Sequence, residues 1–275
     1  MNGRTATRAE LRQLAGLARA RERRLAGECL VEGATLLGEA LAAALAPRVV
    51  VIAESLADRH GDLLDRAHAA GATVLWAPAG DLSKEADRDH GPPLLAALPL
   101  PPAGLLSDLP AAGPALVAVL CGLQDPGNVG TLLRSARAFG ASLCVTLPGT
   151  ADVWGPKVIR SSAGAVFAMP CLAVDDLESL LGATDLRPVA ALPPEPASPV
   201  ESAGRSPDAP SPEGQSPERP LPERCLLLLG HETRGLSSVS GVPAVTVPQV
   251  PGVDSLNVAM AGSILMADWY RALST

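Results

Sequence analysis

The chain has 275 residues, of which 47% are hydrophobic and only 2% aromatic, and its formal net charge is −7. This length favours two domains, or one domain with a sizeable addition. The core must be built from Leu, Val and Ala, and aromatic platforms on which bases could stack are scarce. The negative net charge excludes a uniformly basic coat protein for nucleic acid, so any contact with RNA must come from a local basic patch.

Such a patch is concentrated at the N-terminus. Seven of the 22 Lys and Arg residues precede position 25, and all seven are arginines: Arg4, Arg8, Arg12, Arg19, Arg21, Arg23 and Arg24. A solvated helix face and an RNA contact are equally compatible with this pattern. A transit peptide, which is also rich in arginine, is disfavoured because Glu10 and Glu22 lie within the run.

The five cysteines are odd in number and lie far apart without a CxxC pair: Cys29, Cys121, Cys144, Cys171 and Cys225. Most lie in apolar runs, which predicts buried free thiols in a reducing cytoplasm. Neither a disulfide framework nor a metal site is indicated, because the four histidines show no ligand spacing either. We expect a cytoplasmic protein without a membrane partner, since no long proline-free apolar stretch and no signal peptide are present.

The first part of the chain is predicted to form a small α/β domain. Residues 8–45 have helical periodicity with a break near Gly27, and residues 48–53 form an apolar strand. A second helix precedes a strand over residues 72–76. We therefore expect a first domain over residues 1–95.

A proline-rich stretch, with seven prolines between Gly91 and Pro114, predicts a linker over residues 96–114 that contains at most one short strand. A second α/β domain is expected over residues 115–275. Its predicted strands alternate with helices, which is typical of a parallel sheet covered on both faces, and they span residues 115–121, 142–147, 187–192, 225–229 and 244–247. Residues 193–222 hold ten of the 27 prolines and are expected to be a disordered insert.

Three segments of the second domain look like parts of a site, and each follows a predicted strand. The first, residues 123–130 (Leu-Gln-Asp-Pro-Gly-Asn-Val-Gly), leads into a helix that carries Arg134. Pro126 and Gly127 predict a tight turn, and Asn128 is a candidate helix cap. On its own, this stretch is also typical of an ordinary capped helix with a surface arginine. Its spacing matches neither the GxGxxG nucleotide motif nor the GxxxxGK[ST] phosphate loop.

The second segment, residues 229–236 (Leu-Gly-His-Glu-Thr-Arg-Gly-Leu), places Glu232 between two glycines. Glycines permit a ligand to approach the backbone closely. The third segment, residues 247–258, opens the last helix, and Asp254 or Ser255 is a candidate cap for that helix. The last helix is apolar on most faces, which predicts that it is buried in the domain or against a second copy of the chain.

Together and in this order, the three segments resemble the NxGxxxR, GxExxGL and Pro…SLN motifs of the SpoU/TrmH family of RNA 2′-O-ribose methyltransferases. Residues 157–164 (Lys-Val-Ile-Arg-Ser-Ser-Ala-Gly) and 30–33 (Leu-Val-Glu-Gly) also look like the family. The resemblance covers nearly the whole chain apart from the linker and the insert. Ala259 departs from it, because many members have serine there, and the insert is longer than is usual.

The resemblance implies an α/β fold in which the C-terminal parallel-sheet domain forms a deep trefoil knot. The smaller N-terminal α/β domain, similar to a ribosomal protein, would bind the RNA substrate. S-adenosyl-L-methionine would be the methyl donor, held by loops around Gly230, Val247 and Leu256, with no metal. The family also works as a homodimer through the knotted domain, and we expect the same here.

By the same resemblance, Arg134 is the catalytic arginine, while Asn128, Glu232, Ser255 and Asn257 orient it and complete the pocket. A guanidinium holds its proton firmly, so positioning a phosphate or stabilising an alkoxide suits it better than acting as a base. The expected substrate is RNA, and the separate N-terminal domain favours ribosomal RNA. Two alternatives stay open: a tRNA methyltransferase acting on a 2′-oxygen or a guanine base, and a catalytically silent RNA-binding module.

Overall fold

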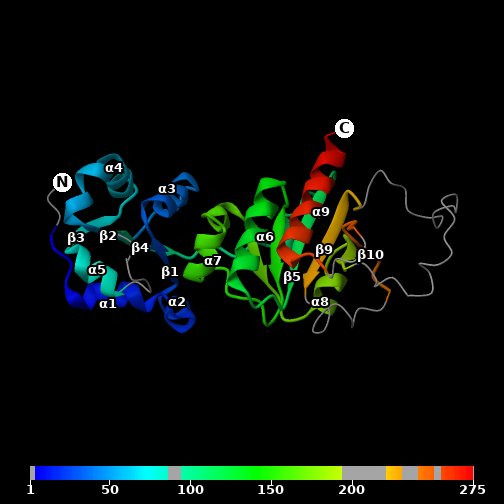
Figure 1. Ribbon diagram of the computed structural model, residues 1–275, viewed down its shortest axis with the longest axis horizontal. Coiled ribbons are helices and arrows are strands. Elements are labelled where there is room, and N and C mark those ends of the chain that lie inside the picture. Colours follow the sequence, from blue (N-terminus) through cyan, green and yellow to red (C-terminus); the bar gives the residue numbers. More distant parts are fainter. Residues whose placement is uncertain (1–3, 86–93, 194–220, 231–240, 251–254, 275) are drawn as a thin grey trace. The chain divides into compact units, whose positions relative to one another are not determined.

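The structure is a computed structural model that describes residues 4–85, 94–193, 221–230, 241–250 and 255–274. The chain forms two compact units. The first unit comprises Met1–Ala103, Asp125–Arg134 and Ala151–Met169, and the second comprises Gly104–Gln124, Ser135–Thr150 and Pro170–Thr275. Each unit contains one β-sheet flanked by helices (Figure 1).

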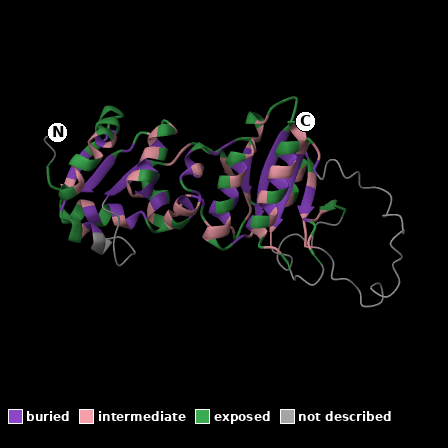
Figure 2. Cartoon of the chain, turned by 45° about the horizontal axis from the view of Figure 1, so that its top comes forward, coloured by how far each residue is buried: buried purple, intermediate pink, exposed green. Residues whose placement is uncertain are grey.

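The sheet of the first unit has four strands in the order β1-β4-β2-β3. Their bounds are β1 (Glu28–Glu32), β4 (Leu94–Pro99), β2 (Val49–Ala53) and β3 (Thr73–Ala77). Strands β2 and β3 are parallel, whereas β4 runs antiparallel to both β1 and β2. The strands are almost wholly buried, as their apolar sequences require (Figure 2).

Helices cover both faces of this sheet. Helices α1 (Arg8–Gly16) and α5 (Ala79–Glu85) lie on one face, where Leu11 and Leu82 pack on Val51 and its neighbours. Helices α3 (Ala34–Ala42) and α4 (Gly61–Ala69) pack together on the other face, which takes alternate strand residues such as Ile52. The short helix α2 (Ala20–Ala26) contacts β1.

The structure corrects two parts of the sequence prediction for this unit. The predicted helix over residues 8–45 is interrupted by β1, because the apolar run Cys29–Val31 pairs with β4. Residues 28–32 are too few for periodicity to distinguish a buried strand from a helix. The predicted linker, residues 96–114, begins inside β4, which lies between β1 and β2 in the sheet.

The sheet of the second unit has six strands in the order β10-β8-β9-β5-β6-β7, and all of its pairs are parallel. The strands are β10 (Ala244–Val245), β8 (Arg187–Ala191), β9 (Arg224–Gly230), β5 (Ala115–Cys121), β6 (Leu143–Thr146) and β7 (Cys171–Ala173). Every residue of β5 is buried, as expected for a strand in the middle of a sheet with both faces covered. The expected α/β class with a parallel sheet is confirmed.

Four further α-helices lie after β5 in the described part of the chain. They are α6 (Pro126–Ala138), α7 (Pro156–Ser161), α8 (Leu177–Gly182) and α9 (Val258–Leu273). Helix α7 belongs to the first unit and packs against β1. Helix α9 packs against β9 in the second unit. Across the part of the chain that the structure describes, no helix combines the length and apolarity needed to cross a membrane.

The C-terminal end of the predicted insert is packed into the second unit. Leu221 is buried, and the indole Nε1 of Trp269 on α9 donates a hydrogen bond to the carbonyl oxygen of Pro222 at 3.1 Å. The predicted insert therefore ends before these two residues, while residues 194–220 lie outside the described residues.

Candidate active site

The residues predicted to bind the cofactor lie in the second unit, at strand ends or next to α9. Gly230 is the last residue of β9, and Val247 is a buried residue just after β10. Leu256 is half-buried and precedes α9. Parallel strands end at one edge of their sheet, so β9 and β10 bring Gly230 and Val247 to the edge where such sheets bind ligands.

The cap of the last helix is Asn257, which corrects the expectation of Asp254 or Ser255. The Oδ1 atom of Asn257 accepts hydrogen bonds from the backbone N–H groups of Ala259, at 2.8 Å, and Met260, at 3.4 Å. Ser255 is exposed two residues earlier. The structure therefore gives Asn257 a defined orientation at the start of α9.

Helix α6 is capped by Asp125, and the prediction of Asn128 as its cap is wrong. The backbone N–H of Asn128 donates to Oδ2 of Asp125 at 3.0 Å, so Asn128 lies in the first turn of the helix. An aspartate at this position also suits the positive end of the helix dipole.

Gly130 fixes the close packing of α6 on α7. A Cβ atom at this position would lie 1.9 Å from Oγ of Ser161 and 2.7 Å from the backbone nitrogen of Ser162. Neither distance is physically possible, so only glycine fits here. The hydroxyl of Ser161 also donates to the carbonyl oxygen of Pro126 at 2.9 Å, which holds α7 against the first turn of α6.

Arg134 lies on α6, with its side chain exposed, next to Leu132 and Leu133, which are fully buried. Among the described residues its guanidinium forms no ion pair. The next residue, Ser135, is held in the second unit, where its Oγ lies 2.6 Å from Oγ of Ser263 on α9. This hydrogen bond joins the end of α6 to the helix that Asn257 caps. Glu232, the remaining predicted catalytic residue, lies outside the described residues.

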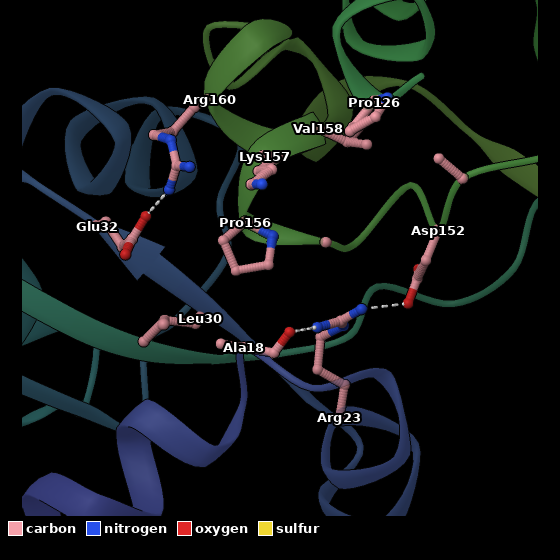
Figure 3. Close-up of a pocket in the computed structure, with 12 residues that line it drawn as sticks. Ala18, Arg23, Leu30, Glu32, Pro126, Asp152, Pro156, Lys157, Val158 and Arg160 are labelled. Atoms are coloured by element: carbon pink, nitrogen blue, oxygen red, sulfur yellow. Dashed lines mark hydrogen bonds and ion pairs between the residues drawn. The ribbon is translucent and has the colours of Figure 1, made fainter. Parts of the chain in front are cut away.

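A pocket of about 300 Å³ lies within the first unit (Figure 3). Its lining comes from the segment that follows α1, including α2 and β1, from the first residue of α6, and from α7 with the loop that leads into it. The residues are Ala18, Arg23, Leu30, Glu32, Pro126, Ala151, Asp152, Gly155, Pro156, Lys157, Val158 and Arg160. Sequence reasoning did not find this pocket, because its walls lie more than 90 residues apart in the chain.

Two ion pairs lie on opposite sides of this pocket, with Pro156 between them (Figure 3). On one side Nη2 of Arg23 lies 2.5 Å from Oδ2 of Asp152, and on the other Arg160 pairs with Glu32. The side chain of Arg23 is only 4% exposed. This burial corrects its assignment to the N-terminal basic patch, since a buried and paired arginine is part of the structure. The other six arginines of the N-terminal patch are exposed: Arg4, Arg8, Arg12, Arg19, Arg21 and Arg24.

Three of the five cysteines are buried thiols whose surroundings disfavour the thiolate. Burial raises the pKa of Cys121 and of Cys225 to about 12. Burial likewise raises the pKa of Cys29 to about 12, although the charge of Arg23 opposes it. A thiol acts as a nucleophile only as the thiolate, so these three groups are inert near neutral pH.

The fold and the site define an α/β protein of two units. Its candidate ligand site lies at the edge of the parallel sheet where β9 and β10 end. The family described as SpoU rRNA Methylase matches residues 115–267, and the MRM3-like substrate binding domain matches residues 8–96. The chain belongs to the SpoU rRNA methylase family, and its enzyme class is RNA methyltransferase.

Individual relatives agree with the family match. A 23S rRNA uridine 2′-O-methyltransferase of Streptomyces viridochromogenes is 28% identical over 203 residues, covering 72% of this chain and 68% of the relative. The human mitochondrial rRNA methyltransferase 3 is 29% identical over 58% of this chain, which spans only 47% of that protein. The crystal structure of an AdoMet-bound rRNA methyltransferase from Sinorhizobium meliloti has the same fold, with a TM-score of 0.76, 22% identity and 98% of both chains covered.

Proposed function

We propose that this protein transfers the methyl group of S-adenosylmethionine to a ribose 2′-hydroxyl of ribosomal RNA. The observation that carries this proposal is the family match over residues 115–267, which spans all three motif segments. The relative from Streptomyces viridochromogenes is named for this same reaction. S-adenosylmethionine is the cofactor because the chain belongs to the SpoU methylase family.

We propose that the chain consists of an RNA-binding domain over residues 1–95, a linker over 96–114 and a methyltransferase domain over 115–275. The substrate-binding match over residues 8–96 supports the first of these. The trefoil knot remains part of the proposal, because chain segments next to Gly230 and before Leu256 lie outside the described residues.

The residues of the second unit fit the cofactor. Oε1 of Gln249, two residues after Val247, is buried and has no hydrogen-bond partner among the residues that the structure describes. Buried polar atoms are nearly always satisfied, so this acceptor indicates a donor that the described part of the chain does not provide. S-adenosylmethionine carries an adenine amino group and an ammonium group, and either would supply that donor. When bound, the cofactor supplies an electrophilic methyl group on a sulfonium.

The chain's own residues would prepare the RNA for attack. A ribose hydroxyl is a poor nucleophile, and negative charge develops on its oxygen as the proton leaves. Arg134 presents a fixed cation at an exposed position of α6, which suits it to hold the neighbouring phosphate or to stabilise that oxygen. We assign supporting roles to Asn128, Glu232, Ser255 and Asn257, of which Asn257 has the defined orientation of a helix cap.

Alkaline hydrolysis tests the reaction directly. A 2′-O-methyl group removes the hydroxyl that cleaves the adjacent phosphodiester, so ribosomal RNA treated with this protein and S-adenosylmethionine should gain one alkali-resistant linkage. The linkage is measured as a single gap in an otherwise continuous hydrolysis ladder, and untreated RNA is the control. A methylated RNA with an unbroken ladder would instead support methylation of a guanine base, and tRNA as the methylated substrate would contradict the ribosomal assignment.

The exposed N-terminal arginines are proposed to contact RNA phosphates. Changing Arg8, Arg12, Arg19 and Arg24 to Gln should weaken RNA binding and make its dependence on salt shallower. Each lost phosphate contact removes about 0.7 from the slope of log K against log salt for single-stranded RNA, so four contacts account for a change of roughly 3. Fluorescence anisotropy at several salt concentrations measures the slope.

The matched control for this experiment is Arg66→Gln on α4, which covers the opposite face of the same sheet and is also exposed. This variant removes an arginine without touching the proposed contact surface. An unaltered slope in the quadruple variant would contradict the proposed role of the N-terminal patch.

We also propose a homodimer formed through the methyltransferase domain. Helix α9 supports this, because its apolar side chains Met260 and Ile264 are exposed in the single chain and a second copy could cover them. A cytoplasmic location is proposed as well, since the five cysteines are free thiols. Sedimentation of the full chain measures the oligomeric state. Cell fractionation tests the location.

A further inference from the structure

The pocket of the first unit has no part in the methyl-transfer chemistry proposed above. None of Asn128, Arg134, Ser255 and Asn257 is among its lining residues. Its volume, about 300 Å³, is at the small end of ligand pockets, which suits one nucleotide-sized group and nothing longer.

The walls of the pocket are mainly apolar and rigid. Leu30 and Val158 are buried, and two prolines, Pro126 and Pro156, face the cavity (Figure 3). Such walls accept the flat faces of a planar ring. The two ion pairs hold the walls in place, because Arg23 also donates through Nη1 to the carbonyl oxygens of Leu17 and Ala18, at 2.9 and 2.7 Å.

Three polar side chains of the lining keep an atom that is free to bind a ligand. Glu32 pairs with Arg160 through Oε2, and among the described residues its Oε1 accepts no hydrogen bond. Its side chain is only 9% exposed, so this acceptor is held at the pocket rather than in bulk solvent. Lys157 is exposed and, within the described part of the chain, has no ion-pair partner. Nε of Arg23 is also buried without a partner.

We propose that this pocket binds one unpaired nucleotide of the RNA substrate, different from the nucleotide that is methylated. The base lies between the apolar walls, Glu32 accepts a hydrogen bond from a base N–H, and Lys157 contacts the phosphate. The pocket thereby selects RNA in which a second nucleotide is free to leave its helix. This inference rests on the proposed function, because it takes RNA as the substrate.

The test fills the pocket without disturbing the core. Ala18 is exposed in the turn between α1 and α2, so Ala18→Leu places a larger side chain at the pocket wall. The matched control is Ala69→Leu, also at an exposed position, on α4. Filling the pocket should weaken RNA binding about tenfold, the order expected for losing one bound base, and raise KM with kcat unchanged. The control should bind like the parent protein.

An abasic scan of the RNA identifies the bound nucleotide. A ribosomal RNA fragment is made with single abasic positions, and its affinity for the parent chain and for Ala18→Leu is measured by fluorescence anisotropy. One position should weaken binding to the parent about tenfold and have no further effect on Ala18→Leu, because both changes remove the same contact. Additive losses at every position would overturn the proposal.

Three further measurements accompany this test. In calorimetry, Ala18→Leu and Ala69→Leu should bind S-adenosylmethionine with the same affinity as the parent protein. In thermal unfolding, both should have the same midpoint as the parent. Lys157→Gln should make the salt dependence of RNA binding shallower by about one contact, roughly 0.7 in slope. An unchanged slope would remove the phosphate contact from the proposal. Normal RNA binding with no methylation would contradict the proposed function, whereas normal methylation by Ala18→Leu with unchanged KM would contradict the pocket alone.

Discussion

Arg134→Ala should lower the rate of methyl transfer by a factor of about 10² to 10³. This is the loss expected when one group that stabilises developing charge in a transition state is removed. The affinity for S-adenosylmethionine should stay nearly unchanged, because the proposed partner of Arg134 is the RNA and not the cofactor. Single-turnover methylation and calorimetry measure the two quantities separately.

The matched control is Arg137→Ala, which removes another exposed arginine one turn further along α6. This variant should retain most of the activity. Arg134→Lys keeps the charge but loses the planar fork of donors, so it should recover only part of the rate if two hydrogen bonds are made to the RNA. Equal losses of cofactor affinity and turnover in Arg134→Ala would show that its role is misassigned.

Gly130→Ala should destabilise the first unit by about 3 kcal/mol, the upper end of the usual cost of forcing a methyl group into a packed contact. The new Cβ would overlap Oγ of Ser161 and the backbone of Ser162, so α6 and α7 would have to separate. Thermal unfolding should show a midpoint lower by about 6–12 °C. Adding Ser161→Gly should restore part of this loss, because it removes the nearer of the two overlapping groups.

Gly61→Ala is the control for this substitution. Gly61 begins α4, its backbone is already helical, and nothing lies within 4 Å of a Cβ placed there. The change should be neutral or stabilise the unit by about 0.5 kcal/mol, because alanine restricts the unfolded chain. A midpoint as low for Gly61→Ala as for Gly130→Ala would contradict the packing argument.

Five of the six strands of the second sheet could be predicted from the sequence because their signals are local, whereas the three-residue strand β7 was not predicted. The five strands are short apolar runs separated by turn residues, and the predicted strand over residues 115–121 agrees with β5 residue for residue. The order of strands follows less directly, since β8 and β9 are neighbours although residues 194–220 separate them in the chain. The motif that leads from β5 into α6 was found because its residues are consecutive.

The errors arose where distant residues decide the outcome. Residues 28–32 form a strand because β4, more than 60 residues later, provides its partner. Arg23 is buried because Asp152, 129 residues away, neutralises its charge. The error over the cap of α6 is a local one: Asn128 was predicted and Asp125 is observed, because turn chemistry alone does not determine where the first turn of a helix begins.

The ion pairs of Arg23 and Glu32 also bear on the order in which the chain is made. During translation, residues 1–103 leave the ribosome well before Asp152 and Arg160, which complete the first unit. Until then Arg23 and Glu32 lack their partners, and burying an uncompensated charge is strongly unfavourable. The N-terminal segment therefore stays incompletely packed until about 50 more residues have emerged. A fragment that stops before residue 150 would retain this defect, because Ala151–Met169, which complete the first unit, follow the beginning of the second unit in the chain.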